Sequence, residues 1–292
     1  MTMTQRIESF DIMKGIGIIL MIVAHTMGPD NRLWDYIYAF HMPLFFVVTG
    51  YFYKQDPLPK LLKKNRDQLL IPYIVLCIVI VILSQIRQPH NICTDIIISF
   101  NGMGPGWFLL AMFLVRLEFH YILKMFPNNY LIISLIISTI VCFIANYHDI
   151  PSFLSFFPSL VGMFFVAIGY YIRIHSLLEF DKKYPFIYIS LGLIFWFITS
   201  IFGKVEMFHC VFKLSIIDIC GSLGGTFLIY KLSKLIDNGN NGIKTILSQA
   251  GRYTLVILFF HSIDYCIYVW YIFEPLFPSS IRLFVILVIR LL

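Results

Sequence analysis

The sequence predicts an all-α integral membrane protein with about ten transmembrane helices in one bundle. Apolar residues make up 59% of the 292 positions. Charged residues make up only 13%, against about 25% in soluble domains. Apolar segments near 20 residues long recur along the chain, and that length crosses a hydrocarbon core of about 30 Å. Little sequence lies between these segments, so we expect a single transmembrane domain at 1–292 without an appended soluble module.

Each apolar segment of this length is predicted as one span. The first covers residues 10–27 and ends at Gly28-Pro29, where a helix is expected to stop. The third follows a basic cluster at residues 60–66 and reaches residue 86, and the fourth begins with the glycine-rich segment 101–107. The other predicted spans cover residues 34–53, 130–145, 153–172, 186–202, 211–232 and 251–271, and a tenth follows Pro278.

The positions of lysine and arginine predict the orientation of the chain. If the amino terminus is cytoplasmic, the loops on that side receive most basic residues, including Lys63, Lys64 and Arg173. The positive-inside rule therefore predicts a multi-pass protein with both termini in the cytoplasm. These loops also explain the net charge of +6. We therefore expect membrane lipid around the protein and no nucleic-acid partner.

The predicted first span carries ionisable side chains, which a lipid-facing helix normally excludes. Asp11 and Lys14 lie near its start, and His25 lies near its end. Such groups are costly in hydrocarbon unless they face protein or a wet cavity, so they indicate a function. The eleven positions from Lys14 to His25 cover about 16 Å of helix, roughly half of the hydrocarbon core. We expect Lys14 toward the cytoplasmic face and His25 toward the outer face.

Four motifs occur in order along nearly the whole chain. The first places His25 eleven residues after Lys14, with Arg6 and Asp11 upstream. The others are Phe-His-Met-Pro-Leu-Phe-Phe at residues 40–46 followed by Thr49-Gly50, Pro-Gly-Trp-Phe-Leu at residues 105–109, and Gly251, Thr254 and His261. Together they resemble the signature of the membrane-bound acyltransferase-3 family. The compact form, without an attached hydrolase-like domain, resembles the fucose O-acetylase-like group of that family.

The resemblance implies transfer of an acyl group, usually acetyl, from cytoplasmic acyl-CoA to a hydroxyl of an extracytoplasmic or lipid-linked cell-surface glycan. It also implies a location in the cytoplasmic membrane, with acetyl-CoA as co-substrate and no bound cofactor. Arg6, Lys14 and Arg66 match the motif positions expected to hold the donor's phosphates. Family members often carry a second arginine three residues after the position of Arg66, where this chain has Leu69.

The chemistry points to histidine. A sugar hydroxyl is a weak nucleophile at neutral pH and needs a base within hydrogen-bond reach, and an unperturbed histidine pKa near 6.5 suits that role. His25 is therefore the predicted general base. A relay through an acyl-enzyme stays open, although no cysteine or serine has a recognisable base partner in the sequence. The six cysteines show no metal-ligand spacing, so no metal site is expected.

Each assignment also has a purely structural alternative. His25 could face lipid headgroups, Lys14 could snorkel or pair with Asp11, and Arg66 lies in a cluster that topology alone explains. His41 could bind the acceptor or hydrogen-bond within the bundle, and Trp107 could anchor its helix at the membrane interface. The candidate supporting or acceptor-binding residues are Asp11, His41, Trp107 and His261.

Two other functional classes compete with acyl transfer. A transporter or flippase of a glycan-related or other polar substrate would use its intramembrane charges as a coupling pathway. These charges are Arg116, Glu118, Asp218 and Asp264. A non-catalytic scaffold would have no need for the Lys14 and His25 arrangement. Consumption of acyl-CoA separates the first class from both others.

Overall fold

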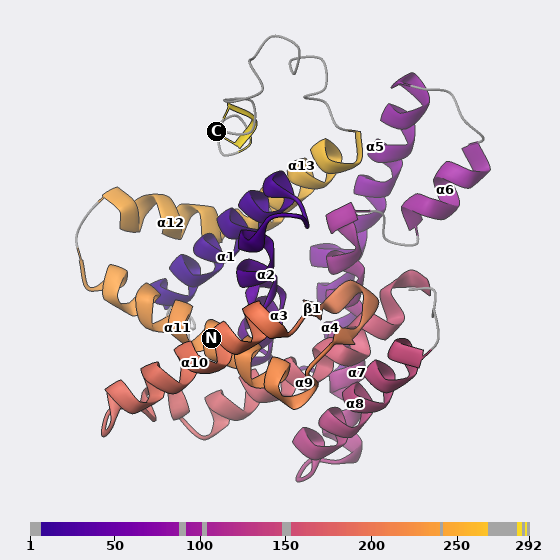
Figure 1. The fold of residues 1–292 in the computed structure, drawn as a ribbon. Helices are drawn as coiled ribbons and strands as arrows, with labels where there is room; N and C mark the ends of the chain where they lie inside the picture. Colours follow the sequence, from indigo (N-terminus) through magenta and orange to yellow (C-terminus); the bar gives the residue numbers. More distant parts are fainter. Residues whose placement is uncertain are drawn as a thin grey trace.

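The computed structural model describes residues 7–87, 92–100, 104–147, 153–239, 242–267, 285–287 and 290. This part of the chain is a helical bundle in which α1 and α3 lie near the middle (Figure 1). Six helical segments in it are long and apolar enough to cross a membrane. The prediction of an all-α membrane protein is therefore confirmed.

The candidate spans are α1 (Glu8–Met27), the continuous segment Leu58–Arg87, Gly104–Met125, α9 (Phe156–Ile174), α10 (Pro185–Phe202) and α11 (Ile216–Asp237). The segment Leu58–Arg87 contains α4 (Leu58–Asn65), a π-helical turn (Arg66–Leu70) and α5 (Ile71–Arg87), and Gly104–Met125 contains a 3-10 turn (Gly104–Gly106) and α7 (Trp107–Met125). The other helices are α2 (Arg32–Tyr38), α3 (His41–Tyr51), α6 (Ile92–Phe100), α8 (Tyr130–Tyr147), α12 (Gly242–Arg252) and α13 (Thr254–Ile267). Further 3-10 turns cover Phe153–Ser155, Leu177–Glu179 and Met207–His209, and the strands are β1 (Val205–Glu206) and β2 (Val211–Phe212).

Several predicted spans coincide with single helices. The predictions at 10–27, 130–145, 153–172 and 186–202 correspond to α1, α8, α9 and α10, and the eighth corresponds to α11 with a later start. Helices α6 and α12 were not predicted, because one is short and the other carries Lys244 and Arg252 among its apolar residues. The ninth span corresponds to α13 as far as residue 267, and most of the tenth lies outside the described residues.

The predicted span at 34–53 is divided into α2 and α3. In a continuous helix, Pro43 would have to donate a hydrogen bond to the carbonyl of Ala39, but proline has no N–H and its ring would clash with that carbonyl. The chain instead breaks at Ala39 and Phe40, and α3 starts at His41, so that Pro43 falls in its first turn. The break therefore has a local cause in the sequence, and it sets the position of His41.

Two helix pairs touch through their backbones. A Cβ atom at Gly15 of α1 would overlap the carbonyl of Leu247 in α12, and one at Gly251 would overlap the carbonyl of Asp11. Helices α3 and α9 show the same reciprocal contact, where Gly50 and Gly169 each face a carbonyl of the other helix. Small residues at helix contacts are typical of membrane proteins, because association there depends on close packing.

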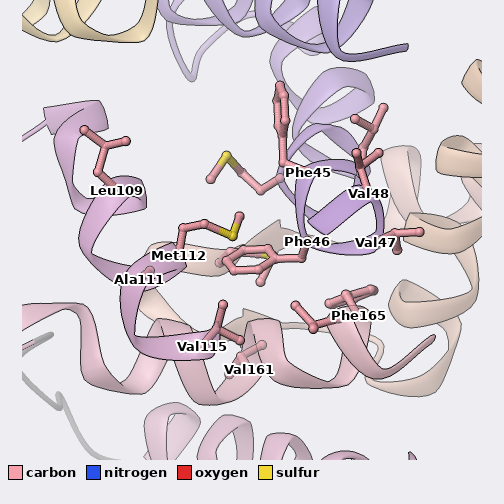
Figure 2. Packing of buried hydrophobic residues seen from close by; sticks show 14 of the residues in the cluster. Phe45, Phe46, Val47, Val48, Leu109, Ala111, Met112, Val115, Val161 and Phe165 are labelled. Carbon is pink, nitrogen blue, oxygen red and sulfur yellow. The ribbon is translucent and has the colours of Figure 1, made fainter. Parts of the chain in front are cut away.

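Aromatic and aliphatic side chains fill the space between α3, α7 and α9. Phe46 is fully buried and lies next to Met112 of α7 in Figure 2. Val115 of α7 and Val161 of α9 belong to the same cluster and are also fully buried. This packing holds α3 in place against α7 and α9. It thereby also positions the part of the cavity wall that α3 forms, which is described below.

The outward faces of α8 and α10 are strongly apolar. Exposed side chains there include Ile132, Ile136 and Phe143 on α8 and Phe186 and Phe202 on α10. A soluble protein rarely exposes apolar surface on this scale. These faces are consistent with contact to lipid tails.

Candidate functional site

A cavity of about 440 Å³ lies at the end of the bundle where α1 ends. Its wall is formed by α1, α2, α3, the start of α7, the segment from β1 to the following 3-10 turn, and α13. The wall combines polar groups with aromatic rings, and the rings belong to Trp34, Tyr38, Phe45, Trp107, Phe108, Phe208 and Tyr265. A mostly apolar cavity with a few converging polar groups is typical of a small-molecule site.

Both ring nitrogens of His25 have partners. Nε2 lies 2.8 Å from the hydroxyl of Tyr38, and Nδ1 lies 2.8 Å from Nε2 of His261. A neutral imidazole has one donor and one acceptor nitrogen. His25 therefore donates to one neighbour and accepts from the other, which makes a continuous chain of hydrogen bonds from Tyr38 through His25 to His261.

The local sequence explains how Tyr38 reaches His25. The Asn31 side chain accepts a hydrogen bond from the backbone N–H of Leu33 and so caps the start of α2. Trp34 and Tyr38 are one helical turn apart on α2, and their rings stack with centroids 3.7 Å apart. Both rings also contact the ring of His25. The short helix therefore presents a rigid aromatic wall beside the histidine.

His41 is a second imidazole in the cavity wall. It is buried at the start of α3, and its Nδ1 lies 3.1 Å from the carbonyl oxygen of Ile37. A carbonyl only accepts, so Nδ1 carries the hydrogen and, in the neutral ring, Nε2 holds the lone pair. The structure thus includes the hydrogen bond within the bundle that was one of the two alternatives for His41, and it also places this residue at the cavity.

Lys14 and Asp11 lie toward the other end of α1, away from the cavity. The ammonium group of Lys14 is 2.8 Å from the carboxylate of Asp11, and Arg252 of α12 lies 3.8 Å from the same side chain. Lys14 is 28% exposed, so it is paired and also accessible. One helix therefore carries His25 at the cavity and this ion-pair group about 16 Å away.

The remaining predicted residues lie in different places. Trp107 lines the cavity, and His261 lies behind His25 as its hydrogen-bond partner. Arg66 lies at the start of the π-helical turn, exposed and paired with Asp67 at 2.8 Å. Arg6 is outside the described residues.

Sequence reasoning missed the polar group that β1 and the following turn bring to the cavity. The carboxylate of Glu206 lies 2.7 Å from Nδ1 of His209 and 2.8 Å from the ammonium of Lys204. Burial alone would raise the pKa of Glu206, but the hydrogen bonds from Lys204 and His209 outweigh it and lower the pKa below its usual value. Glu206 is thus an anion at the cavity wall. The signal in the sequence was three charged or titratable residues within six positions of a loop.

No metal-binding cluster is evident in this region. Among the described residues, no three His, Cys, Asp or Glu side chains are grouped so that they could hold a metal ion. The polar groups at the cavity can instead accept and donate protons, and the aromatic rings can hold an apolar face of a ligand.

The chain is similar to known proteins in two comparisons. It matches the model of the acyltransferase-3 family, described as an acyltransferase domain, over residues 7–292. It is also 32% identical over 123 residues to nodulation protein NolL of Mesorhizobium japonicum, a match that covers 36% of this chain and 33% of that protein. The match thus spans about a third of the relative. No solved structure matches the chain. Because the family model covers nearly all of the sequence, the chain belongs to the acyltransferase-3 family.

Proposed function

We propose that this protein transfers an acyl group, usually acetyl, from cytoplasmic acyl-CoA to a hydroxyl of an extracytoplasmic or lipid-linked cell-surface glycan. The observation that carries the proposal is the hydrogen-bonded chain of Tyr38, His25 and His261 at the wall of a cavity large enough for a small ligand. Family membership supports acyl transfer as the reaction class. His25 acts as the general base.

The proposed reaction is a direct transfer. The acceptor hydroxyl gives its proton to His25 while its oxygen attacks the thioester carbonyl, which forms a tetrahedral oxyanion. The bond from carbon to sulfur then breaks, the ester is released, and the departing thiolate takes the proton from His25. For this step the acceptor hydroxyl takes the place of the Tyr38 hydroxyl at Nε2, while Nδ1 keeps its hydrogen bond to His261, which orients the imidazole. General base catalysis of this kind contributes roughly 10²–10⁴-fold.

The aromatic wall supports a sugar as the acceptor. Trp34, Trp107 and Phe208 present flat apolar surfaces, and Glu206 supplies an acceptor for hydroxyl hydrogens. A sugar ring has an apolar face of C–H groups and a polar rim of hydroxyls, which fits such a mixture. His41 and Glu206 are the proposed acceptor-binding groups.

The acyl donor enters from the opposite side. Its phosphates are assigned to Arg6, Lys14 and Arg66, with acetyl-CoA as a co-substrate and no bound cofactor. The accessible part of Lys14 supports this assignment, although the residue also pairs with Asp11. The thin pantetheine arm then extends into the bundle toward His25.

The same proposal includes the domain, the membrane and the orientation of the chain. We infer a single domain over residues 1–292 with about ten spans, in the cytoplasmic membrane of a bacterial-type cell, with both termini in the cytoplasm. The fucose O-acetylase-like group is the proposed subgroup. The basic residues in the loops support this orientation.

The transporter alternative rests on four intramembrane charges. In the structure these groups have separate partners: Glu118 accepts from Ser159, Asp218 accepts from the backbone of Leu214, Asp264 pairs with Arg290, and Arg116 donates to Asn65. A coupling pathway would require them to communicate. Each of these four residues is paired with a partner outside the group, so the structure gives no reason to prefer transport over acyl transfer.

The decisive experiment measures transfer of label from acetyl-CoA into glycan by membranes that contain equal amounts of folded protein. His25→Ala is expected to lose nearly all transfer. His175→Ala, which removes an exposed histidine after the end of α9, is the matched control and is expected to keep wild-type activity. Equal transfer by His25→Ala and wild type would remove His25 as the base. No transfer by the wild type with a broad panel of acceptors would contradict the proposed function.

A further inference from the structure

Arg116 and Asn65 form a buried pair that the proposed reaction does not use. The guanidinium of Arg116, on α7, donates to the side-chain oxygen of Asn65, on α4, at 3.3 Å. Asn65 is 0% exposed. Its amide nitrogen is buried and has no hydrogen-bond partner among the described residues. A buried donor without a partner is costly, so it indicates a missing acceptor.

The orientation of the Asn65 amide is chemically fixed. Arg116 has only donors, so the oxygen of the amide must face the guanidinium and the nitrogen must point away from it. Turning the amide round would place two donors against each other. The pair therefore presents only donors to its surroundings, namely the amide N–H groups of Asn65 and the remaining N–H groups of Arg116.

The positive charge of Arg116 is not neutralised locally. Among the described residues, no carboxylate lies within ion-pair distance of its guanidinium. Glu118 is two positions later on α7, which places it on a different side of the helix, where it accepts from Ser159 of α9 at 2.6 Å. Lys64 precedes Asn65 and adds a further positive charge. An unneutralised arginine in a membrane-spanning helix is expected to serve a ligand or a wet cavity.

The surroundings also leave room for access. Arg116 retains part of its surface exposed. Next to Asn65 the helix widens into the π-helical turn Arg66–Leu70, which avoids a clash between the ring of Pro72 and a carbonyl in the preceding turn. Trp107, at the cavity, is nine residues before Arg116 on the same helix, or about 14 Å along its axis. The pair therefore lies deeper in the bundle than the cavity wall.

We propose that Asn65 and Arg116 form an anion-binding site that takes a phosphate group of the acyl donor. The assignment to this donor rests on the proposed function, whereas the anion site itself rests on the donors and charge described above. Phosphate oxygens accept several hydrogen bonds and carry the negative charge that Arg116 lacks nearby. A phosphate held here lies about 14 Å deeper along α7 than Trp107 at the cavity, so the pantetheine arm of the donor has to extend from this site toward His25.

The test measures ligand binding by thermal stabilisation of the purified full chain, with CoA, pantetheine and inorganic phosphate as probes. The variants are Arg116→Gln and Asn65→Asp. In Asn65→Asp the new carboxylate pairs with Arg116, so this variant folds even if Arg116→Gln does not, while its negative charge repels phosphate. Lys124→Gln is the matched control, because it removes one exposed positive charge from the end of the same helix.

The expected result is that CoA binds wild type and Lys124→Gln with equal affinity and binds both site variants about tenfold or more weakly. Pantetheine, which has no phosphate, should bind all four proteins equally. CoA affinities of both site variants within about threefold of wild type would overturn the site. Binding of inorganic phosphate that depends on Arg116, without binding of CoA, would support the anion site and overturn its assignment to the acyl donor. Binding of neither CoA nor phosphate by wild type would overturn the whole inference.

Discussion

The contact between Gly162 of α9 and the ring of Phe46 gives a quantitative prediction. A Cβ atom at residue 162 would lie 2.5 Å from a ring carbon of Phe46, which is fully buried. Overpacking of this kind costs about 1–3 kcal/mol, offset by up to about 1 kcal/mol because alanine is the better helix former. We expect Gly162→Ala to lose about 1–2 kcal/mol of unfolding free energy, or about 2–6 °C in Tm.

The assay is thermal unfolding of the purified protein in detergent. Gly192→Ala on α10 is the matched control, because its Cβ would meet its nearest neighbour at an ordinary 3.5 Å. That variant is expected to be unchanged or slightly stabilised. Phe46→Leu alone should destabilise the protein, yet it should also remove about 1 kcal/mol of the cost of Gly162→Ala. Strictly additive losses in the double variant would refute the reasoning, since they would mean that the two side chains do not meet.

Three further predictions concern the cavity, the surface and the helix contact. Glu206→Gln removes an anion from the cavity wall and should raise the KM for the acceptor about tenfold, without affecting the KM for acetyl-CoA; a change only in the donor KM would contradict this role. Hydrogen bonds from Lys182 and Lys234 lower the pKa of Glu179 to about 2 in the folded protein. The ionised Glu179 therefore stabilises the folded state fully at pH values above its ordinary pKa of 4.5, and this contribution is lost as the pH falls toward 2. Wild type should therefore lose more Tm than Glu179→Gln between about pH 5 and pH 3, and parallel curves would exclude this contribution. Gly251→Val should force α1 and α12 apart and abolish the monodisperse peak in size-exclusion chromatography, so a wild-type elution profile would show that the two backbones do not touch.

The sequence was a good guide to several residues that lie at or next to the cavity and a poor guide to their hydrogen-bond partners. His25, His41, Trp107 and His261 could be selected because ionisable or aromatic residues stood in recognisable motifs. The hydrogen bond between His25 and His261 joins opposite ends of the chain, so no local pattern contains it. Tyr38 was missed because a tyrosine within an apolar segment is usually a packing residue.

The backbone irregularities were only partly predictable. Pro43 could have indicated the break between α2 and α3, but its effect was hidden because the apolar run continues on both sides. Asn65 lies within a cluster of lysine and arginine that topology explains, so its burial could not be inferred from composition. In both cases, tertiary packing determined which of several chemically reasonable structures forms.

The backbone contacts between α1 and α12 and between α3 and α9 have a mechanical consequence. When a glycine of each helix sits against a carbonyl of the other, neither helix can slide or roll without driving backbone atoms into each other. Each pair therefore moves as a rigid body. His25 is carried by the first pair and His41 by the second. If the cavity opens, we therefore expect the motion at the loops and the outer helices. During such a motion His25 keeps its position relative to α12, and His41 keeps its position relative to α9.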